Sequence, residues 1–307
     1  MKRLAFQLAI SLLFGAGALA QQDPLVSQYM FNGLYLNPAY AGSHDYWSST
    51  LSYRNQWVRF DGAPETMIAA VDGPISKKNM GLGLILMHDK IGVSRQSSAI
   101  ANYSYQLKIN EKDKLALGIN AGFSQYGADL TKLTVWDQDQ VFQKDLTGRI
   151  IPRAGLGVYY YSKRYYAGLS VPTLIAFQKD YPSSIDLSKS SFLRRHYLLT
   201  GGYVFDLKND FKLKPSILLK YVENAPLQAD LNMSIVYKDM IWFGTSFRTG
   251  DATVFLVEYQ PNKHFRIAYA YDLSFSKMRN YSNGSHEIML GIDFGKDLVK
   301  VKTPRYF

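Results

Sequence analysis

The feature that most constrains this chain is a regular alternation of apolar and polar residues. Between residues 227 and 238, every odd position through Tyr237 is apolar, and every even position is polar except Val236. This period of two is that of a β-strand, whose successive side chains point to opposite faces. The pattern recurs at 97–109, 263–274 and 284–295. Such segments exceed the about five or six residues of a typical strand and match the roughly 9–11 residues with which a tilted strand crosses a bilayer.

The alternation therefore predicts an all-β fold, a transmembrane outer-membrane β-barrel of about 14 antiparallel strands. An even number of strands is what bacterial outer-membrane barrels require. The predicted strands are 47–57, 64–74, 80–89, 97–109, 113–126, 151–161, 164–173, 195–207, 211–223, 227–238, 239–249, 252–260, 263–274 and 284–295.

The connections between these segments sort by length. The longest, 127–150 and 174–194, fall on one side of the predicted barrel, whereas short connections such as 110–112 and 162–163 fall on the other. Short periplasmic turns and longer outer loops are typical of outer-membrane barrels. A soluble β-sandwich or propeller is the alternative, because its strands also alternate. The long strands, the tyrosines at strand ends in 159–166 and the lack of a repeat of about 20–50 residues favour the barrel.

The amino-terminal residues predict export. Lys2 and Arg3 precede an apolar stretch that ends in Ala18-Leu19-Ala20, the small-x-small pattern of a signal-peptide cleavage site. An amino-terminal membrane anchor is the alternative. The expected organisation is a signal peptide (1–20), an N-terminal periplasmic or plug-like segment (21–46), the barrel (47–295) and a periplasmic C-terminal tail (296–307). The chain has no cysteine, so we expect no disulfide to stabilise it.

The segment Gln28–Gly42, QYMFNGLYLNPAYAG, is aromatic yet interrupted by Asn-Pro and two glycines. Its aromatic side chains would be exposed to water if the segment were free in the periplasm, and burial of each contributes about 1.5–3 kcal/mol. We therefore predict that it tucks into the periplasmic mouth of the barrel as a plug or lining, or else forms a docking surface for a partner. The candidate residues are Tyr29, Phe31, Asn37, Pro38, Tyr40 and Gly42.

A second group of candidates lies on the predicted strands. In the predicted first strand, Arg54 and Gln56 share one face, expected to be the lumen, while Trp57 shares the lipid and interface face with Tyr53. Lumenal polar groups of this kind either satisfy one another or contact cargo or the plug-like segment. Asp89 and Glu287 are further candidates for plug or partner binding.

The sequence contains no recognisable catalytic or metal-binding motif. Its five histidines form no HExxH or paired pattern, and no Gly-x-Ser-x-Gly elbow accompanies His88-Asp89. We expect no enzymatic activity, no catalytic or metal-ligating residue and no cofactor. Asp137, Asp139 and Asp145 could hold Ca²⁺ or simply form a solvated acidic loop. The formal net charge of +10 is spread along the chain without a basic block, so no nucleic-acid partner is expected.

Several sequence blocks together resemble one protein family. They are Asp23-Pro24, 28–32, 37–43, 53–57, 62–64, 72–74 with 81–83, 89–92 and 285–291. In order and content these blocks resemble the PorP/SprF family of type IX secretion system membrane proteins, found in the outer membranes of Bacteroidota.

The resemblance implies a location in the cell outer membrane and a role in protein secretion or surface anchoring of cargo such as gliding-motility adhesins. The implied partners are the C-terminal region of a secreted cargo protein, other type IX components and outer-membrane lipid. An outer-membrane channel for a small solute is the alternative function. The sequence leaves open which cargo is held, whether the lumen is open or plugged, and which loops contact partners.

Overall fold

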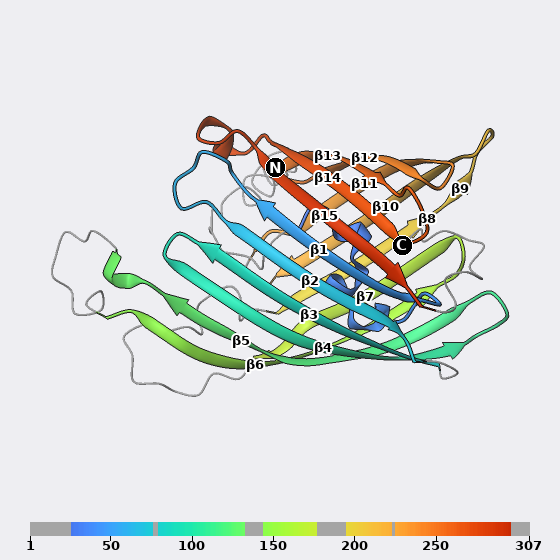
Figure 1. Ribbon diagram of the computed structural model, residues 1–307, viewed down its shortest axis with the longest axis horizontal. Helices are drawn as coiled ribbons and strands as arrows, with labels where there is room; N and C mark the ends of the chain where they lie inside the picture. The colour runs from blue at the N-terminus through green and yellow to red at the C-terminus, as the bar shows by residue number, and fades with distance from the viewer. Residues whose placement is uncertain (1–25, 76–78, 133–143, 177–194, 223–224, 296–307) are drawn as a thin grey trace, which may run out of the picture.

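The computed structural model describes residues 26–75, 79–132, 144–176, 195–222 and 225–295. Across these residues the chain forms a closed antiparallel β-barrel (Figure 1). Its strands are β1 (Trp47–Asn55), β2 (Glu65–Pro74), β3 (Met80–Ile91), β4 (Ser94–Lys108), β5 (Lys114–Ala128), β6 (Leu146–Tyr161), β7 (Tyr165–Ala176), β8 (His196–Tyr203), β9 (Phe205–Asp206), β10 (Phe211–Val222), β11 (Gln228–Tyr237), β12 (Ile241–Arg248), β13 (Ala252–Tyr259), β14 (Phe265–Ser274) and β15 (Ser285–Phe294).

In the described part of the chain the barrel wall has fourteen positions, each occupied by one strand or by two strand pieces in line, and we call each position a stave. Of the 15 labelled strands, β8 and β9 both pair with β10, so they are two pieces of one stave. Each stave pairs with its neighbours in sequence, and β1 closes the barrel against β15, with Leu51 opposite Leu290. Closure leaves no stave with a free edge, which matters in lipid because every backbone N–H and C=O there needs a partner. The predicted fourteen-stranded barrel is confirmed.

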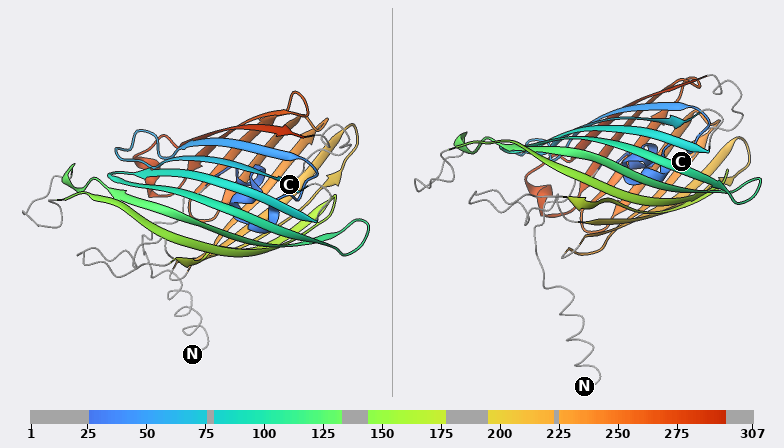
Figure 2. Two further views of the ribbon diagram at one scale, coloured as in Figure 1. Left: turned by 60° about the horizontal axis from the view of Figure 1, so that its bottom comes forward. Right: turned by 90° about the horizontal axis from the view of Figure 1, so that it is seen from below.

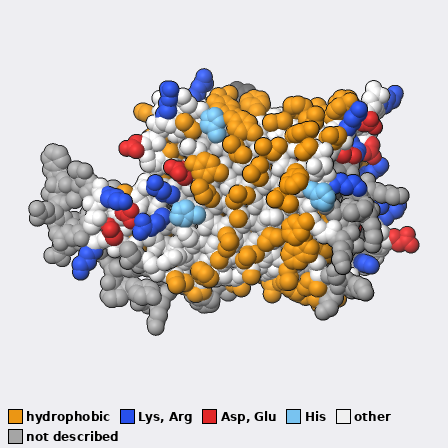
Figure 3. Space-filling model, in the orientation of Figure 1, with side chains coloured by type: hydrophobic (Ala, Val, Ile, Leu, Met, Phe, Trp, Pro, Cys, Tyr) orange, Lys and Arg blue, Asp and Glu red, His pale blue; other side chains and the backbone are white. Residues whose placement is uncertain are grey.

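The two faces of each stave differ as the alternation predicts. Along β11, Leu231, Met233 and Ile235 point outward and are exposed, whereas Asp230 and Asn232 point inward and are buried. Figure 3 shows hydrophobic side chains over the middle of the visible wall, with charged side chains toward the two ends of the strands. An apolar outer band around a polar interior is the arrangement of a membrane-spanning barrel.

Connections at one end of the barrel are tight turns. Asn209-Asp210 and Lys238-Asp239 each have two consecutive residues with φ between 52° and 61°, the type I′ geometry that matches the twist of paired strands. In the β4–β5 turn, the Asn110 amide donates to the Asp113 carboxylate over 2.7 Å and lowers its pKa. The β5–β6 and β7–β8 connections at the opposite end are longer, so we assign the turn end to the periplasm.

Within the described ranges, helical structure is confined to short turns. Three of these turns lie near the amino terminus: η1 (Tyr29–Phe31), α2 (Gly33–Leu36) and η2 (Pro38–Tyr40). Figure 2 shows them inside the barrel. Two more, η3 (Leu130–Lys132) and η7 (Lys277–Asn280), lie in the outer connections. Among the described residues, none of these helices is long and apolar enough to cross a membrane. The predicted signal peptide and C-terminal tail lie outside the described residues.

Candidate functional site

The candidate site is the N-terminal segment, residues 26–42, together with the lumenal wall that it contacts. Tyr29, Phe31 and Tyr40 retain 6%, 5% and 2% of their surface exposed, so they are buried inside the barrel. The segment starts near the outer ends of β1, β14 and β15, where Ser27 contacts Glu287, and reaches Gly42 near the periplasmic ends of β2 and β3. It therefore extends well beyond the periplasmic mouth, to which the sequence assigned it.

The outer end of the segment is held by two acidic residues of the wall. The Glu287 carboxylate accepts hydrogen bonds from the backbone N–H groups of Ser27, at 2.7 Å, and Gln28, at 3.1 Å. The Gln28 side-chain amide donates to the Glu287 carbonyl at 2.7 Å, and the Ser27 hydroxyl donates to Asp272 at 2.7 Å. Hydrogen bonds to an ionised carboxylate are roughly twice as strong as neutral ones. Two adjacent residues of the chain are thus fixed by charge-assisted bonds.

These carboxylates belong to a buried network of ion pairs. Arg54 pairs with Asp272 at 2.7 Å and with Glu287 at 3.2 Å. Arg248 contacts Asp272 at 3.4 Å and Asp230 at 3.2 Å. Charges removed from water are costly unless they are paired and hydrogen-bonded, and here the segment supplies some of the hydrogen bonds. We call Arg54, Arg248, Asp230, Asp272 and Glu287 the charge cluster.

The middle of the segment packs against the wall through aromatic and main-chain groups. The Asn232 amide donates to the Tyr29 hydroxyl at 2.8 Å. Phe31 meets Trp242 edge to face, with ring centroids 5.7 Å apart. The Ser170 hydroxyl donates to the Leu36 carbonyl at 2.6 Å. Burial of aromatic rings in this geometry adds attraction beyond the apolar area removed from water.

The inner end of the segment, which is the end nearer the periplasm, packs against glycines of the wall, which carry no side chain. A Cβ atom at Gly118 would lie 2.1 Å from the Ala39 nitrogen, and one at Gly157 would lie 2.1 Å from the Asn37 side-chain oxygen. Real Cβ atoms essentially never come within 3.0 Å of another heavy atom in this way, so only glycine permits the approach. The space lets Asn37 donate to the Val158 carbonyl at 2.9 Å.

The last residues of the segment are tied to the periplasmic half of the wall. The Ser104 hydroxyl donates to the Ala41 carbonyl at 2.6 Å, and the Gly42 N–H donates to Asp72 at 3.0 Å. The Gln106 amide donates to the Gly42 carbonyl. Gly42 has φ +63°, a left-handed conformation that glycine adopts without strain. The N-terminal segment is therefore anchored at both ends and packed between them.

The structure brings together eight of the eleven candidate residues from the sequence: Tyr29, Phe31, Asn37, Pro38, Tyr40, Gly42, Arg54 and Glu287. Asp89 lies on β3, where it accepts a hydrogen bond from the Thr66 hydroxyl at 2.6 Å.

The sequence predicted that Gln56 and Trp57 lie on opposite faces of the first strand, but neither residue lies in a strand. β1 ends at Asn55, and both residues belong to the β1–β2 connection. Trp57 has φ 50°, a left-handed conformation that breaks the strand geometry. Its backbone N–H donates to the Ser285 hydroxyl at 3.1 Å.

Sequence reasoning missed most of the partners of the segment. Asp272 and Arg248 occupy inward positions of alternating strands, so the alternation places them in the lumen, but it does not give their height along the barrel axis. The wall glycines Gly118 and Gly157 also lie within alternating segments, where a glycine signals close approach of a backbone or ligand. The two glycines therefore indicated a close approach to the wall, but not which part of the chain makes it.

Within the described ranges, no group of three or more His, Cys, Asp or Glu side chains is placed to hold a metal ion. Asp137 and Asp139, which the sequence offered as possible calcium ligands, lie outside the described residues.

A protein-family model matches most of the chain. The family model "Type IX secretion system membrane protein PorP/SprF" matches residues 18–292. No curated protein sequence matches the chain significantly. The family description and the closed barrel place the protein in the outer membrane, as the sequence predicted.

Solved structures with a similar barrel share little sequence with it. The KdgM porin has 12% identity and a TM-score of 0.39, over 81% of this chain and 99% of that chain. The Acinetobacter baumannii outer membrane protein Omp33 has 9% identity and a TM-score of 0.44, over 83% and 100%. The Ralstonia pickettii toluene transporter TbuX has 9% identity and a TM-score of 0.46, over 90% and 95%.

The family match spans nearly all of the 307 residues, including the N-terminal segment and all strands up to β15. The chain therefore belongs to the PorP/SprF family of type IX secretion system membrane proteins.

Proposed function

We propose that this barrel supports the secretion or the surface anchoring of cargo proteins that leave through the type IX system, by holding the C-terminal region of a secreted protein such as a gliding adhesin. Family membership supports a place in that system. The observation that carries the proposal is the anchored N-terminal segment, which occupies the lumen with buried, hydrogen-bonded residues. A barrel filled in this way is better suited to present a fixed surface than to conduct a large solute.

An ordered outer surface is available for such a partner. The β1–β2 and β14–β15 connections are joined by two main-chain hydrogen bonds of 2.9 Å, from Val58 to Gly284 and from Asn283 to Val58. Phe60 and Tyr281 on these connections are 43% and 67% exposed. Exposed aromatic side chains on a rigid base are typical anchors of protein interfaces. We define the Phe60–Tyr281 surface as residues 58–61 and 277–283.

The basic side chains near these aromatics add a preference for an acidic partner. Arg59, Lys277 and Arg279 are exposed on the same two connections, and Asp61 is the one acidic residue of the surface, which leaves it with more basic than acidic side chains. Positive charge at the rim of an interface speeds association with a negatively charged partner and makes binding sensitive to salt. We expect the C-terminal region of the cargo to carry acidic and apolar residues.

The proposal is tested by affinity purification of the barrel from native outer membranes in mild detergent, with mass spectrometry of the proteins retained. We expect a large secreted protein in the eluate and its loss from the cell surface when the barrel gene is deleted. Replacing Phe60 and Tyr281 by Ser should reduce the retained cargo at least tenfold, because hot-spot aromatics each contribute about 2 kcal/mol or more. A matched control is Tyr259→Ser on the opposite, periplasmic end of β13.

Two results would overturn the proposal. One is recovery of the barrel alone at full yield. The other is an unchanged secreted and surface proteome after deletion of the gene. In either case the alternative function, an outer-membrane channel for a small solute, is favoured, and conductance of the reconstituted barrel tests it directly.

A further inference from the structure

The direction in which the N-terminal segment runs through the barrel determines where the chain in front of it lies. Ser27 donates to Glu287, which is the third residue of β15, at 2.7 Å. The Ser27 hydroxyl also accepts from Arg54, the last residue but one of β1, at 2.8 Å. β1 ends and β15 begins at the outer side of the barrel. The start of the segment is therefore held close to the outer rim, while Gly42 at its other end lies toward the periplasm.

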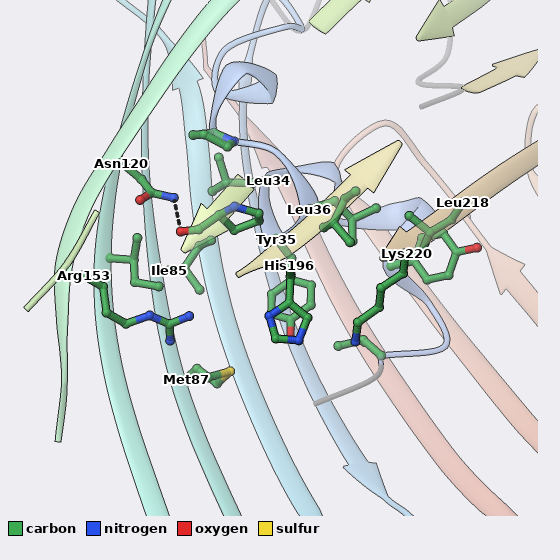
Figure 4. Close-up of a pocket in the computed structure, with 16 residues that line it drawn as sticks. Leu34, Tyr35, Leu36, Ile85, Met87, Asn120, Arg153, His196, Leu218 and Lys220 are labelled. Atoms are coloured by element: carbon green, nitrogen blue, oxygen red, sulfur yellow. Dashed lines mark hydrogen bonds between the residues drawn. The ribbon is translucent and has the colours of Figure 1, made fainter. Parts of the chain in front are cut away.

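The lumen between this start and the periplasm is filled by the segment itself. Leu34 and Tyr40 are both 2% exposed. Figure 4 shows Leu34 and Leu36 inside the barrel, with Ile85 toward one side and Leu218 toward the other. The cavity beside the segment has a volume of about 80 Å³. At about 10–15 Å³ for each water, this space holds about five to eight waters, which is far less than a second pass of the chain needs.

The chain in front of the segment is short once the predicted signal peptide is removed. Cleavage after Ala20 leaves residues 21–25 before Val26. Five residues extend at most about 18 Å. The periplasmic end of β15, Phe294, lies seven residues beyond Glu287, about 24 Å along the strand and about 18 Å in depth at a tilt of about 40°. Only a fully extended chain in an empty lumen would reach the periplasmic mouth, so residues 21–25 stay on the outer side.

The outer rim next to the start of the segment carries the Phe60–Tyr281 surface. This surface belongs to the connection that follows β1 and the connection that precedes β15, the two strands that hold the start of the segment. Trp57, one residue before the surface, donates its backbone N–H to the Ser285 hydroxyl at 3.1 Å. A chain that leaves the lumen from Ser27 toward the outside therefore emerges beside these two connections.

We propose that the mature amino terminus emerges on the extracellular side of the barrel, beside the Phe60–Tyr281 surface, and that residues 21–25 form part of the surface that meets the C-terminal region of the cargo. These residues lie outside the described part of the chain, so their place follows from the position of the segment and from the chain length. The contact with cargo rests on the proposed function, whereas the extracellular position of the chain end does not.

The position is tested with single-cysteine variants, because the natural chain has no cysteine. Intact cells that carry Gln22→Cys, Tyr281→Cys or Lys163→Cys are treated with a membrane-impermeant maleimide. Tyr281 is exposed on the outer β14–β15 connection, and Lys163 is exposed on the periplasmic β6–β7 turn. Gln22→Cys should be labelled in intact cells to the same extent as Tyr281→Cys, whereas Lys163→Cys should react only after the outer membrane is permeabilised.

Two measurements validate these variants. Labelling of each purified barrel in detergent shows that all three thiols are reactive, and heat-dependent mobility in gel electrophoresis shows that each barrel is folded. Mass spectrometry of the mature chain shows that cleavage has occurred after Ala20. Asp23→Cys serves as a second position if Gln22→Cys alters the cleavage.

Contact with cargo is tested with a bulky label. A long polyethylene glycol maleimide coupled to Gln22→Cys should lower the cargo retained on affinity purification by about tenfold or more, because a polymer within an interface prevents close packing. The matched control is the same polymer on Lys132→Cys. Lys132 is exposed on η3, in the outer β5–β6 connection and outside the Phe60–Tyr281 surface, so its label should leave cargo recovery unchanged.

Two results would overturn this inference. One is labelling of Gln22→Cys only after permeabilisation, as for Lys163→Cys. The other is equal cargo recovery with the polymer on Gln22→Cys and on Lys132→Cys, which would show that the chain end does not contact cargo. A barrel that retains no cargo in any form contradicts the proposed function instead, and the labelling of intact cells still decides where the chain end lies.

Discussion

The charge cluster makes a quantitative prediction for the variant Glu287→Gln. The substitution keeps the size of a side chain with no exposed surface, but it removes the charge that accepts from Ser27, Gln28 and Arg54 at 2.7, 3.1 and 3.2 Å. The glutamine oxygen still accepts one of these bonds, while its NH₂ group faces donors. Arg54 keeps its pair with Asp272 at 2.7 Å, so the buried charge is not left without a partner.

The magnitude follows from the bonds that are weakened. A hydrogen bond to a charged group contributes about 1.5–3 kcal/mol, and breaking a buried ion pair outright costs about 3–5 kcal/mol. Because Asp272 still compensates Arg54, we expect a loss of about 2–3 kcal/mol in the free energy that holds the outer end of the N-terminal segment. At about 1.4 kcal/mol per factor of ten, the released population should rise about 30- to 150-fold.

Chymotrypsin measures this release directly. The N-terminal segment contains no Lys or Arg but has aromatic cleavage sites at Tyr29, Phe31, Tyr35 and Tyr40. These are buried or nearly so while the segment stays in the lumen. When opening and closing are fast relative to cleavage, the cutting rate follows the released population. Mass spectrometry of the products should therefore show cleavage between residues 29 and 40 about 30- to 150-fold faster in Glu287→Gln than in the parent protein.

Asp293→Asn is the matched control for this prediction. Asp293 lies on the same strand, β15, and accepts from the Ser48 hydroxyl at 2.6 Å and from Arg266 at 3.2 Å. It is a buried lumenal carboxylate paired with an arginine, but its described contacts are with the wall and not with the segment. Cleavage of Glu287→Gln at the parent rate, or equal acceleration in both variants, would refute the idea that Glu287 retains the segment.

Three further variants test other parts of the structure. Gly118→Ala should release the inner end of the segment and speed chymotrypsin cleavage at least tenfold, because the new Cβ would lie 2.1 Å from the Ala39 nitrogen. Phe31→Ala should lower the stability of the docked segment by about 3–5 kcal/mol and shift the fluorescence of Trp242, which lies 5.7 Å from the Phe31 ring. Leu231→Arg, on the lipid face, should lower the unfolding free energy of the barrel in lipid by about 2–4 kcal/mol, measured by denaturant titration in vesicles.

Each of these has a control on the same barrel. Gly201→Ala introduces a Cβ whose nearest neighbour is 3.6 Å away, an ordinary contact, so it should leave cleavage unchanged. Phe255→Ala removes an exposed lipid-facing ring and should not alter the fluorescence of Trp242 through the segment. Leu227→Arg lies at the strand end, where arginine costs about 0–1 kcal/mol. A cost for Leu227→Arg equal to that for Leu231→Arg would contradict the assigned lipid face.

The sequence predicted the barrel well because the same physical constraint acts on every strand. Lipid outside and a polar lumen inside force a period of two, and the predicted boundaries of β2 and β13 lie within one residue of those observed. Predictions were less accurate where that constraint relaxes. β6 begins at Leu146 rather than 151, because its outer extension does not alternate, and its pairing with β5 shifts register between Tyr126 and Ala128.

The candidate site was only partly predictable for a related reason. Alternation identifies the face on which Arg54, Asp272 and Glu287 lie, but their contact also requires the three residues to share a height along the barrel axis. That height depends on strand register, which links Arg54 to Glu287 across β1 and β15. The aromatic content of the N-terminal segment predicted burial, yet nothing in its sequence specifies a path that runs from the charge cluster to Gly42.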